Sequence, residues 1–340
     1  MENVTLTGID LSKESFEICC ENHAGTVVKR RSVRRGGLIE VLYSLPKGSV
    51  VAMEACGSAH YWGQECCKLG LEVKLIAPQH VTPFRMAQKN DRNDAQAICR
   101  AAREPALRRV PLKNREQLDL QTLHRVRERL VKQQTALMNQ VRGILLERGI
   151  TIAQGKGAFR SKVQELVITF GTTNQLGFIL SELWEEFLAL EKRVAAFTKR
   201  LTQMARVNEQ CKLISTLPGV GPITATAIVA AIGDVSAFRN GRAFAAALGL
   251  VPRQHTTGGR IRLGSITKQG NGYLRKLLVH GARSVVRYAV LKQREDRKSL
   301  WIRNLHQRGG TNRASVGLAN KTARQAWAIL AGKQPLSLAA

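Results

Sequence analysis

The runs "VTLTGID" (residues 4–10), "SFEICCEN" (15–22) and "TVVKRRSV" (26–33) decide the fold of the N-terminal part of the chain. Each is a short run rich in β-branched and other apolar residues, and polar turn-forming residues separate one run from the next. Three such strands in close succession predict an antiparallel meander.

Helices and strands alternate from the meander to about residue 105. Apolar periodicity predicts helices at 36–45 and 58–70, strands at 49–55 and 72–78, and a further helical region after them. Three strands followed by α-β-α-β-α is the element order of a ribonuclease H-like layered domain. No glycine fingerprint follows the first strand, which argues against a dinucleotide-binding fold.

Long helices replace this alternation between residues 106 and 210. Apolar residues form two regular runs. The first recurs every seven positions (Leu123, Leu130, Leu137 and Ile144), and the second alternates steps of four and three (Leu183, Phe187, Leu190, Val194, Phe197, Leu201 and Met204). A heptad seam favours a coiled coil, but the seam could equally pack against the first helix within one chain. A glycine-rich break at 149–160 separates the runs and predicts a mobile loop.

The last region, residues 211–340, is mostly helical by pattern. A helix, a tight Gly-x-Gly turn and a second helix are expected at 213–233, and apolar spacing predicts helices at 271–292 and 314–330 before an unstructured tail. The expected fold class is therefore α/β plus all-α, in three domains: residues 1–105, 106–210 and 211–340.

The charge of the chain points to a polyanionic partner. The 340 residues include 53 Lys and Arg against 25 Asp and Glu, a formal net charge of +28. Such a surplus favours nucleic acid, because neutralising phosphates releases counterions, although a generally basic solvated surface remains the alternative. A membrane surface is disfavoured, since no basic amphipathic helix or lipidation signal stands out.

The seven cysteines and the N-terminus suggest a compartment. No C-x-x-C spacing occurs, so neither a zinc motif nor a disulfide framework is indicated, and an odd number of cysteines fits a reducing cytosol. No apolar stretch has the length of a membrane span, and "MENVTLTGIDLSK" lacks the features of a signal peptide. We therefore expect a soluble protein of the cytoplasm.

Four acidic residues form the first constellation with chemical meaning. Asp10 and Glu54 each end an apolar strand, and Asp91 and Asp94 lie three positions apart on a predicted helix, hence on one face. Taken singly, Asp10 suits a turn and Asp91 suits a helix N-cap. Together, these carboxylates can converge on divalent cations such as Mg²⁺, which prefers oxygen ligands and leaves coordination sites open for phosphates.

Two glycine-containing turns form the other constellations. In "LPGVGPITATAI" (217–228), Gly219 and Gly221 match a helix-hairpin-helix, whose second helix can hold a DNA phosphate at its N-terminus; an ordinary helical corner is the alternative. In "RQHTTGGRIRLGS" (253–265), hydroxyls lie among basic residues in an apparent loop. This segment could only hold phosphate, or one hydroxyl could attack it. The cations in and after it are Arg253, Arg260, Arg262 and Lys268, and His255 is a candidate proton carrier.

Five collinear motifs carry a resemblance to a known family. They are "GIDLSK" (8–13), "MEACGSAHYW" (53–62), "KNDRNDA" (89–95), "LPGVGPITA" (217–225) and the long stretch 247–283. Together they resemble the DEDD-type transposases of bacterial insertion sequences (the insertion-sequence-110 family), which are related to the pilin-gene invertases. The likeness runs in order through nearly the whole chain.

The resemblance implies a RuvC-like domain with four metal-binding acids, a coiled coil, and a transposase domain that supplies a nucleophilic serine. By motif, the metal ligands would be Asp10, Glu54, Asp91 and Asp94. Where the family has its serine this chain has Thr257, so the nucleophile would be Thr257, Thr256 or Ser265, or this copy would be impaired. The family also implies a structured noncoding guide RNA, DNA as donor and target, and a homo-oligomer (dimer or tetramer).

The leading hypothesis is thus an RNA-guided DNA recombinase with a composite active site and a covalent protein–DNA intermediate. The first rival is a metal-dependent, junction-resolving nuclease in which water attacks and the basic segment only binds phosphate. The second is a non-enzymatic architectural protein whose acids are structural. The chain has no G-x-x-x-x-G-K-[ST] motif for ATP, and a covalent intermediate would conserve bond energy without it.

Overall fold

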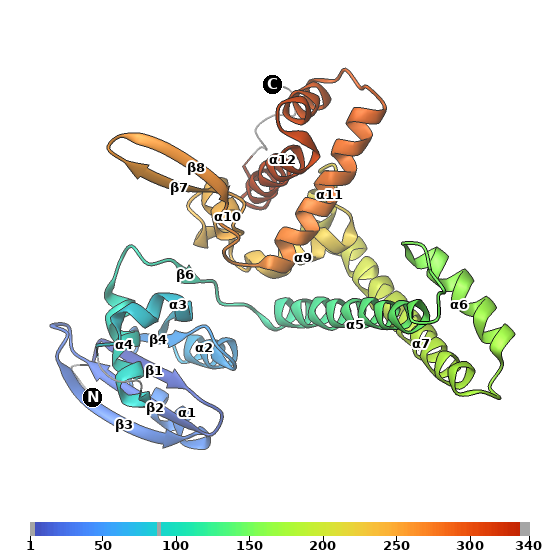
Figure 1. Ribbon diagram of the computed structural model, residues 1–340. Helices are drawn as coiled ribbons and strands as arrows, with labels where there is room; N and C mark the ends of the chain where they lie inside the picture. The colour runs from blue at the N-terminus through green and yellow to red at the C-terminus, as the bar shows by residue number, and fades with distance from the viewer. Residues whose placement is uncertain (1–3, 87–89, 334–340) are drawn as a thin grey trace. The chain divides into compact units, whose positions relative to one another are not determined.

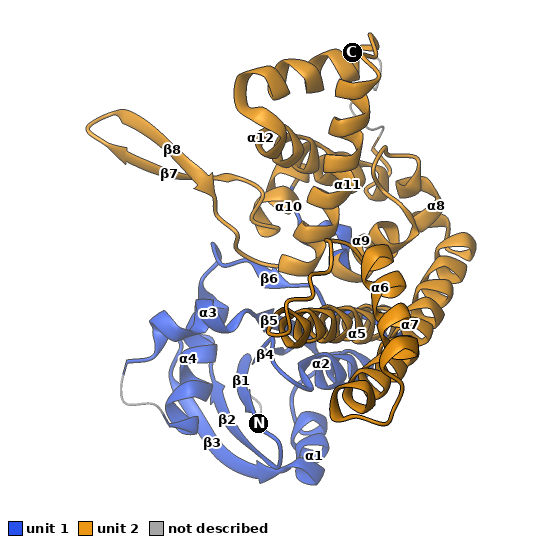
Figure 2. Ribbon diagram, turned by 45° about the vertical axis from the view of Figure 1, so that its right-hand side comes forward, with its two compact units in different colours: residues 1–116, 232–239 blue, residues 117–231, 240–340 orange. Residues whose placement is uncertain are grey.

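The computed structural model describes residues 4–86 and 90–333 (Figure 1), and the chain forms two compact units (Figure 2). Unit 1 comprises residues 1–116 and 232–239, and unit 2 comprises residues 117–231 and 240–340. Compactness alone does not define where a domain begins, so the three-domain division at 105 and 210 stays a prediction. Lys89 and the end of the expected unstructured tail, residues 334–340, lie outside the described residues.

Unit 1 is built on a six-stranded sheet in the order β3-β2-β1-β4-β5-β6. The strands are β1 (Leu6–Leu11), β2 (Ser15–Glu21), β3 (Val27–Arg34), β4 (Val50–Glu54), β5 (Glu72–Ile76) and β6 (Arg109–Val110). The predicted meander is confirmed, since β1 pairs antiparallel with β2 and β2 with β3, while β4 and β5 run parallel to β1. β6 pairs antiparallel with β5, and two residues are too few to show a strand pattern in the sequence.

Helices cover both faces of this sheet. They are α1 (Leu38–Tyr43), α2 (Ala59–Lys68), α3 (Pro78–Val81) and α4 (Asp91–Arg103), with the short 3₁₀ turns η1 (Arg35–Gly37) and η2 (Thr82–Phe84). Ile9 and Leu11 of β1 share a hydrophobic core with α1 and α2, whereas Leu6 shares one with α4. Because side chains alternate along a strand, the even-numbered residues of β1 face α4. Asp10 is therefore on the α4 side of the sheet.

The rest of the chain is mainly helical, with long helices α5 (Arg115–Leu146), α6 (Lys156–Phe170) and α7 (Gln175–Val207) followed by α8 (Glu209–Ser215), α9 (Pro222–Ile232), α10 (Gly241–Ala247), α11 (Gly272–Leu291) and α12 (Arg297–Leu330). A mixed α/β part followed by a mostly helical part agrees with the expected fold class. Polar N-caps mark several helix starts: the side chains of Asn174, Asn208, Asn240, Asn271 and Asp296 each accept a backbone N–H bond. None of the described helices combines the length and apolar character that a membrane crossing requires.

The heptad seam packs within the chain. Phe187 and Leu190 of α7 are buried in one core with Leu130 of α5 and Phe159 of α6. Arg127 of α5 also donates to the Thr198 hydroxyl of α7 at 2.8 Å. Of the two alternatives that the heptads left open, the structure shows the intramolecular packing, and pairing between chains stays a prediction. The loop expected at 149–160 is shorter than predicted, because α6 already begins at Lys156.

The segment expected as a loop at 253–265 is a β-hairpin instead. β7 (Pro252–Thr257) pairs antiparallel with β8 (Arg260–Ile266), and Gly258 and Gly259 form the turn with φ of +56° and +75°. Two successive residues with positive φ make a two-residue hairpin turn whose twist matches the flanking strands, and glycine adopts that backbone without a steric penalty. The Gly-Gly pair between two polar and β-branched runs was the available sequence signal.

A buried histidine lies in the helical core of unit 2. The Nδ1 atom of His124 (α5) is 3.0 Å from the Tyr273 hydroxyl, and its Nε2 atom is 3.1 Å from the Thr226 hydroxyl. Burial, with a smaller contribution from Arg127, lowers the pKa of His124 to about 4. His124 is therefore a neutral hydrogen-bonded core residue and not a surface proton carrier.

Replacing His124 with glutamine is expected to flatten the pH dependence of stability between pH 6.5 and 4. In the unfolded chain His124 takes up a proton near its ordinary pKa of 6.5, whereas the folded ring stays neutral down to about 4, so stability falls as the pH falls through this window. Each pH unit is worth about 1.4 kcal/mol, which makes the loss in the unsubstituted protein about 3 kcal/mol greater than in the variant. Urea titrations at pH 7 and pH 4 measure this difference. Parallel behaviour of the two proteins would contradict it, and the exposed His280, replaced in the same way, controls for loss of an imidazole.

Candidate functional site

Two of the four acids predicted as metal ligands lie at the ends of neighbouring parallel strands. Gly8 pairs with Ala52 and Ile9 with Met53, so Asp10 of β1 and Glu54 of β4 each follow the last matched pair. Ala52 packs on the same side of the sheet as α4, and alternation puts Glu54 on that side too. The pairing register therefore directs both carboxylates toward the face that α4 covers.

The other two acids belong to the first turn of α4. Asn90 caps the helix, because its Oδ1 accepts from the backbone N–H of Asn93 at 2.8 Å. Asp91 is thus the first helical residue and not the N-cap that its sequence context also allowed. Asp91 and Asp94 lie one turn apart, where negative charge is stabilised by the positive end of the helix dipole.

The three groups from β1 and α4 converge. Carboxylate oxygens of Asp10, Asp91 and Asp94 all lie within 4.8 Å of one another, with Asp94 buried and Asp91 exposed. Glu54 is outside this group of three. The pKa of Asp10 rises to about 6, first because of burial and then because of the negative charges of Asp94, Glu54 and Asp91, while Arg85 opposes the rise. The mutual repulsion of these carboxylates favours a positive charge close to them.

A divalent cation fits this donor set. Its ligands would be carboxylate oxygens, which Mg²⁺ and similar hard cations prefer, and the exposed Asp91 leaves one side open to solvent. The raised pKa of Asp10 reports the same electrostatic need, since a bound cation would favour the ionised carboxylate. This group of acids, with Glu54 beside it, is the candidate metal site.

Arg85 is a residue of this site that the sequence did not indicate. It follows η2 and forms an ion pair with Asp94, and both side chains are largely shielded from solvent. The pair fixes the position of the Asp94 carboxylate while leaving Asp10 without a cationic partner of its own in the described residues. A lone arginine after a proline-containing turn carries no periodic or spacing signal, so only the folded chain reveals the pairing.

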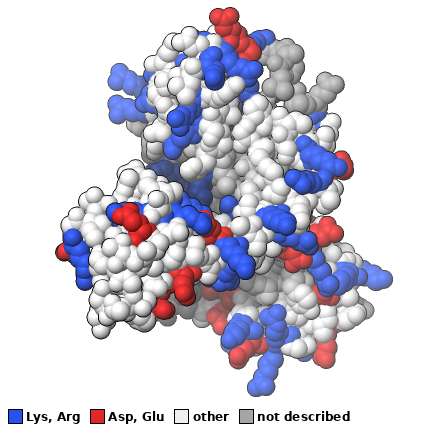
Figure 3. Space-filling model, turned by 90° about the vertical axis from the view of Figure 1, so that its right-hand side faces the viewer, with Lys and Arg blue, Asp and Glu red and all other residues white. Residues whose placement is uncertain are grey.

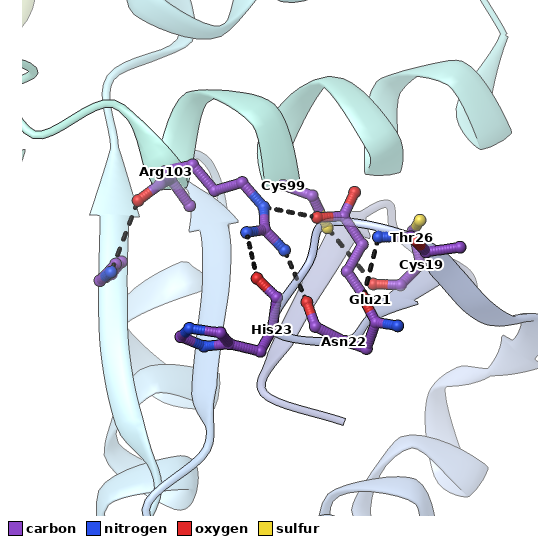
Figure 4. Close-up of polar contacts among 9 residues, drawn as sticks. Cys19, Glu21, Asn22, His23, Thr26, Cys99 and Arg103 are labelled. Atoms are coloured by element: carbon purple, nitrogen blue, oxygen red, sulfur yellow. Dashed lines mark hydrogen bonds and ion pairs between the residues drawn. The ribbon is translucent and has the colours of Figure 1, made fainter. Parts of the chain in front are cut away.

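The far end of α4 is tied to β2 by a separate polar network (Figure 4). Arg103 donates to the Glu21 carboxylate at 2.8 Å and to the backbone oxygens of Asn22 and His23. The Cys99 thiol donates to the Cys19 carbonyl at 3.4 Å. Cys19, Glu21 and Cys99 also lie within 4.8 Å of one another, but Arg103 already neutralises the carboxylate, so we assign this cluster to anchoring the helix.

The hairpin separates its candidate nucleophiles onto two faces. Thr257 pairs with Arg260 and His255 with Arg262, and residues paired across two strands share a face. One face therefore presents a hydroxyl, two guanidinium groups and an imidazole. Thr256 lies on the other face, opposite Ile261, and its hydroxyl accepts from Gln254 Nε2 at 2.9 Å.

The other basic-segment residues lie toward the base of the hairpin. The Cβ atom of Arg253 lies 3.9 Å from the position that a Cβ on Gly264 would take, and Ser265 is part of the wall of a cleft against α12. Lys268 follows β8, where its backbone adopts a φ of +56° and its N–H donates to the Gly249 carbonyl at 3.2 Å. The predicted cations are thus spread along the β7–β8 hairpin and the residues after it, and are not gathered in one loop.

The Gly-x-Gly turn connects α8 to α9, as the sequence predicts. Gly219 has a φ of +84°, and a Cβ there would lie 2.8 Å from the Gly281 carbonyl oxygen of α11. Gly221 is exposed just before the N-terminus of α9. Close packing against α11 accounts for Gly219, whereas Gly221 is free to approach a phosphate. The assignment of this turn as a DNA-binding helix-hairpin-helix stays a prediction.

Basic side chains outnumber acidic ones on the face shown in Figure 3 and are spread over several elements. Some of the acids are already paired: Glu21 binds Arg103, and Glu191 of α7 contacts both Lys156 and Arg160 of α6. Much of the net charge of +28 therefore lies on solvated lysines and arginines, which suits contact with nucleic-acid phosphates.

Comparison with known proteins finds relatives over nearly the whole chain. A DEDD-type family model described as a transposase matches residues 7–149, and the model of the transposase IS116/IS110/IS902 family matches residues 211–298. A probable family 20 transposase of Pseudomonas aeruginosa is 44% identical over 96% of this chain and 97% of its own length. The transposase for insertion sequence element IS1111A of Coxiella burnetii is 41% identical over 97% of this chain and 90% of its own. The pilin gene-inverting protein of Moraxella bovis is 28% identical over 38% of this chain and 39% of its own.

The first family model spans the strands and the helix that carry all four acids, and the second spans the β7–β8 hairpin. Two of these relatives match almost end to end, so the likeness is to whole transposases and not to an isolated module. The chain therefore belongs to the IS116/IS110/IS902 family of transposases and is a DNA transposase of the DEDD type.

Proposed function

We propose that this transposase cuts, exchanges and rejoins DNA strands through a covalent protein–DNA intermediate, guided by a structured noncoding RNA. The single observation that carries the proposal is that the chain holds two separate groups of reactive side chains. Carboxylates from β1 and α4 converge in one place, and a hydroxyl with two arginines occupies one face of a hairpin. Together, these groups match the requirements of phosphoryl transfer.

The acidic group would hold the divalent metal that a DEDD transposase domain implies. Its ligands would be Asp10, Glu54, Asp91 and Asp94, and Mg²⁺ is the ion that we propose. A bound divalent cation neutralises negative charge at the scissile phosphate and favours ionisation of an attacking oxygen. Arg85 keeps Asp94 in place, and the first turn of α4 keeps Asp91 and Asp94 on one side.

Thr257 is the proposed nucleophile. It shares its face with Arg260, Arg262 and His255, whereas Thr256 faces away and its hydroxyl is engaged by Gln254. Ser265 lies at the base of the hairpin, five residues from Arg260 along β8 and so about 17 Å away at the usual strand rise. Arginines grip the oxygens of a phosphate, so the hydroxyl beside them is the one placed to attack it.

The covalent step exchanges one phosphoester bond for another. The Thr257 Oγ atom bonds to phosphorus, the bond from phosphorus to the leaving sugar oxygen breaks, and the hydroxyl proton passes to a base, for which His255 on the same face is our candidate. Rejoining reverses the step with a sugar hydroxyl from the exchanged strand. No ATP is required, because the linkage to threonine conserves the bond energy.

The remaining contacts are proposed from charge and position. Arg253 and Lys268 would hold DNA phosphates near the base of the β7–β8 hairpin. The backbone at Gly219 and Gly221 would hold a further phosphate at the start of α9. The protein would act as a homo-oligomer in the bacterial cytoplasm, at the nucleoid. RNA guidance predicts that target cutting stops when the guide RNA is omitted and resumes, at a new sequence, when its target-pairing loop is changed.

Replacing Thr257 with alanine is expected to abolish the covalent adduct. The protein, guide RNA, Mg²⁺ and labelled target DNA are incubated, denatured and separated by size, so that a protein–DNA adduct appears as a slow labelled band. Removal of the attacking oxygen lowers the adduct below detection, a loss of at least about 1000-fold. Thr257→Ser is expected to form adduct at least as fast as the unsubstituted chain, since it keeps the hydroxyl and lacks the crowding methyl group.

Thr256→Ala and Ser265→Ala are the matched controls and should retain the adduct. If either of them abolishes it while Thr257→Ala does not, the nucleophile is misassigned. If no variant affects cutting, no adduct forms and the products carry free 5′-phosphates, then the protein is a junction-resolving nuclease that uses water. Binding without any cutting, regardless of Mg²⁺, would indicate an architectural protein.

A further inference from the structure

A cleft of about 840 Å³ lies between the base of the β7–β8 hairpin and α12, wholly within unit 2. One wall is formed by residues of the hairpin base, including Ser265 and Ile266, and the other by α12. α12 can form a concave wall because it bends at Gly310, whose φ of +72° interrupts the helix. As a result Trp301, before the bend, and Arg324, after it, line the same cleft.

The cleft is cationic. Arg313, Lys321 and Arg324 line it, and no Asp or Glu is among its lining residues. In the described part of the chain none of these three side chains forms an ion pair. Lys321 lies over the Trp301 ring, with Nζ 4.7 Å from the ring centroid. Three uncompensated cations in one concave site favour an anionic occupant.

The walls between these charges are suited to a planar, partly apolar group. Ile266, Val316 and Ala328 are apolar lining residues, and Trp301 adds an aromatic ring. The volume falls within the usual range for small-molecule sites, about 300–1,000 Å³. A phosphate alone would not need so large an apolar surface, and an apolar ligand would not need the three cations.

A buried amide supplies the third feature. Gln325 lines the cleft and is only 6% exposed, yet its Oε1 has no hydrogen-bond partner among the described residues. A buried amide left without a partner is unfavourable, so a ligand that bonds to it gains affinity. The amide carries a donor and an acceptor that exchange by a half-turn of the side chain, which is the pattern that pairs with the polar edge of a nucleobase.

We infer that this cleft binds one unpaired nucleotide of the DNA strand that lies along the hairpin. The phosphate contacts Arg313 and Arg324, the base enters beside Trp301, and the base edge bonds to Gln325. The assignment to DNA rests on the proposed function, because β8 carries both the face with Arg260 and Arg262 and the wall of the cleft. Taking a base out of a duplex breaks its pairing and stacking, which favours strands that are already opened.

Photo-crosslinking tests the inference without requiring catalysis. The full-length protein is irradiated in EDTA with a single-stranded DNA oligonucleotide carrying 5-iodouracil, which couples to aromatic side chains that it stacks against, and the modified peptide is sequenced. We expect a cross-link at Trp301, and at least about fivefold less of it with the same base in a duplex. Coupling that maps only to exposed aromatic residues such as Tyr43 and Tyr288 would overturn the proposal.

Gln325→Leu and Gln307→Leu form a matched pair on α12, since Gln307 is exposed and outside the cleft. Loss of the amide should reduce the Trp301 cross-link at least about fivefold, while Gln307→Leu leaves it unchanged. Circular dichroism checks that both variants fold, and Arg324→Gln offers a second, more exposed position with the same expected loss. An unchanged cross-link in both Gln325→Leu and Arg324→Gln would overturn the inference.

An RNA oligonucleotide with 5-iodouridine distinguishes the strand. If RNA couples to Trp301 and DNA does not, the assignment to DNA is wrong. The outcome is separable from the proposed chemistry, because Thr257→Ala should leave the cross-link intact. A failure to detect the covalent adduct would therefore leave the Trp301 cross-link as evidence for the cleft. A missing cross-link would overturn the cleft proposal without contradicting the adduct.

Discussion

Replacing Asp10 with asparagine is expected to abolish strand cleavage and to raise the melting temperature of the metal-free protein at neutral pH. Cleavage is lost because the variant removes a carboxylate from the group that holds the divalent cation. Stability rises because burial and the charges of Asp94, Glu54 and Asp91 raise the pKa of Asp10 from 3.8 to about 6, so the ionised carboxylate is unfavourable in the folded state.

The effect of Asp10 on the stability of the folded state depends on pH. Between about pH 4 and 6 the folded state of the unsubstituted protein binds a proton at Asp10 that the unfolded state releases, so stability decreases as the pH rises. Above pH 6 the folded protein carries the full free-energy cost of the ionised Asp10 carboxylate, and the asparagine variant avoids this cost. Calorimetry at pH 4 and pH 7.5 should show the two melting temperatures close together at the lower pH and apart at the higher.

Adding Mg²⁺ should reverse the order, because the cation stabilises only a protein that can bind it. Asp119→Asn, an exposed acid on α5, is the matched control and should change neither cleavage nor the response to Mg²⁺. Asp94→Asn should also abolish cleavage but lower stability, since it leaves the shielded Arg85 without its partner. Cleavage retained by Asp10→Asn, or a lower melting temperature in EDTA, would contradict this account of the site.

Replacing Gly8 with alanine is expected to destabilise unit 1 and to eliminate metal binding, although Gly8 offers no ligand. A Cβ at Gly8 would lie 2.5 Å from the Ala95 carbonyl oxygen and 2.6 Å from Cys99 Sγ, both on α4. The carbonyl belongs to the helix backbone and cannot turn away, so the whole helix must move. Overpacking of a core costs about 1–3 kcal/mol in general, and we expect about 3 kcal/mol here.

The loss of metal binding follows from the same displacement. α4 carries Asp91 and Asp94, and a shift of the helix away from β1 separates them from Asp10. Urea denaturation measures the stability, and isothermal calorimetry with Mn²⁺ measures the site. Gly36→Ala is the control, because no atom lies within 4 Å of the position its Cβ would take. If Gly8→Ala binds Mn²⁺ like the unsubstituted protein, β1 and α4 do not approach as closely as described.

Regular patterns allowed much of the fold to be predicted. The N-terminal meander, the parallel β4 and β5 and the helices at 271–292 and 314–330 all have strong alternation or helical spacing, and each is present. The hairpin at 252–266 was expected as a loop, because its strands are short, exposed and polar and thus lack the buried face that makes alternation visible. The sixth strand of the sheet, β6, could not be predicted, because two residues are too few to show the alternation of a strand.

Some residues of the candidate site could be predicted from local patterns, and others could not. The sequence identified Asp10, Glu54, Asp91 and Asp94 from strand ends and a three-residue helical spacing, which are local properties. It could not identify Arg85 as the partner of Asp94, or Gly8 as the contact that lets α4 reach β1, because both depend on which elements meet. An isolated glycine in a strand signals a close approach but not the element that approaches.

The sequence by itself thus determined the element order, the basic character of the chain, the four acids and the hydroxyls of residues 253–265. These follow from local periodicity, composition and motif spacing. Only the tertiary structure decided that the heptad seam is used within the chain, that Thr257 shares a face with two arginines while Thr256 does not, and that a bent α12 forms a cationic cleft with the hairpin. Each of these depends on strand register or on contacts between distant segments, which no local pattern encodes.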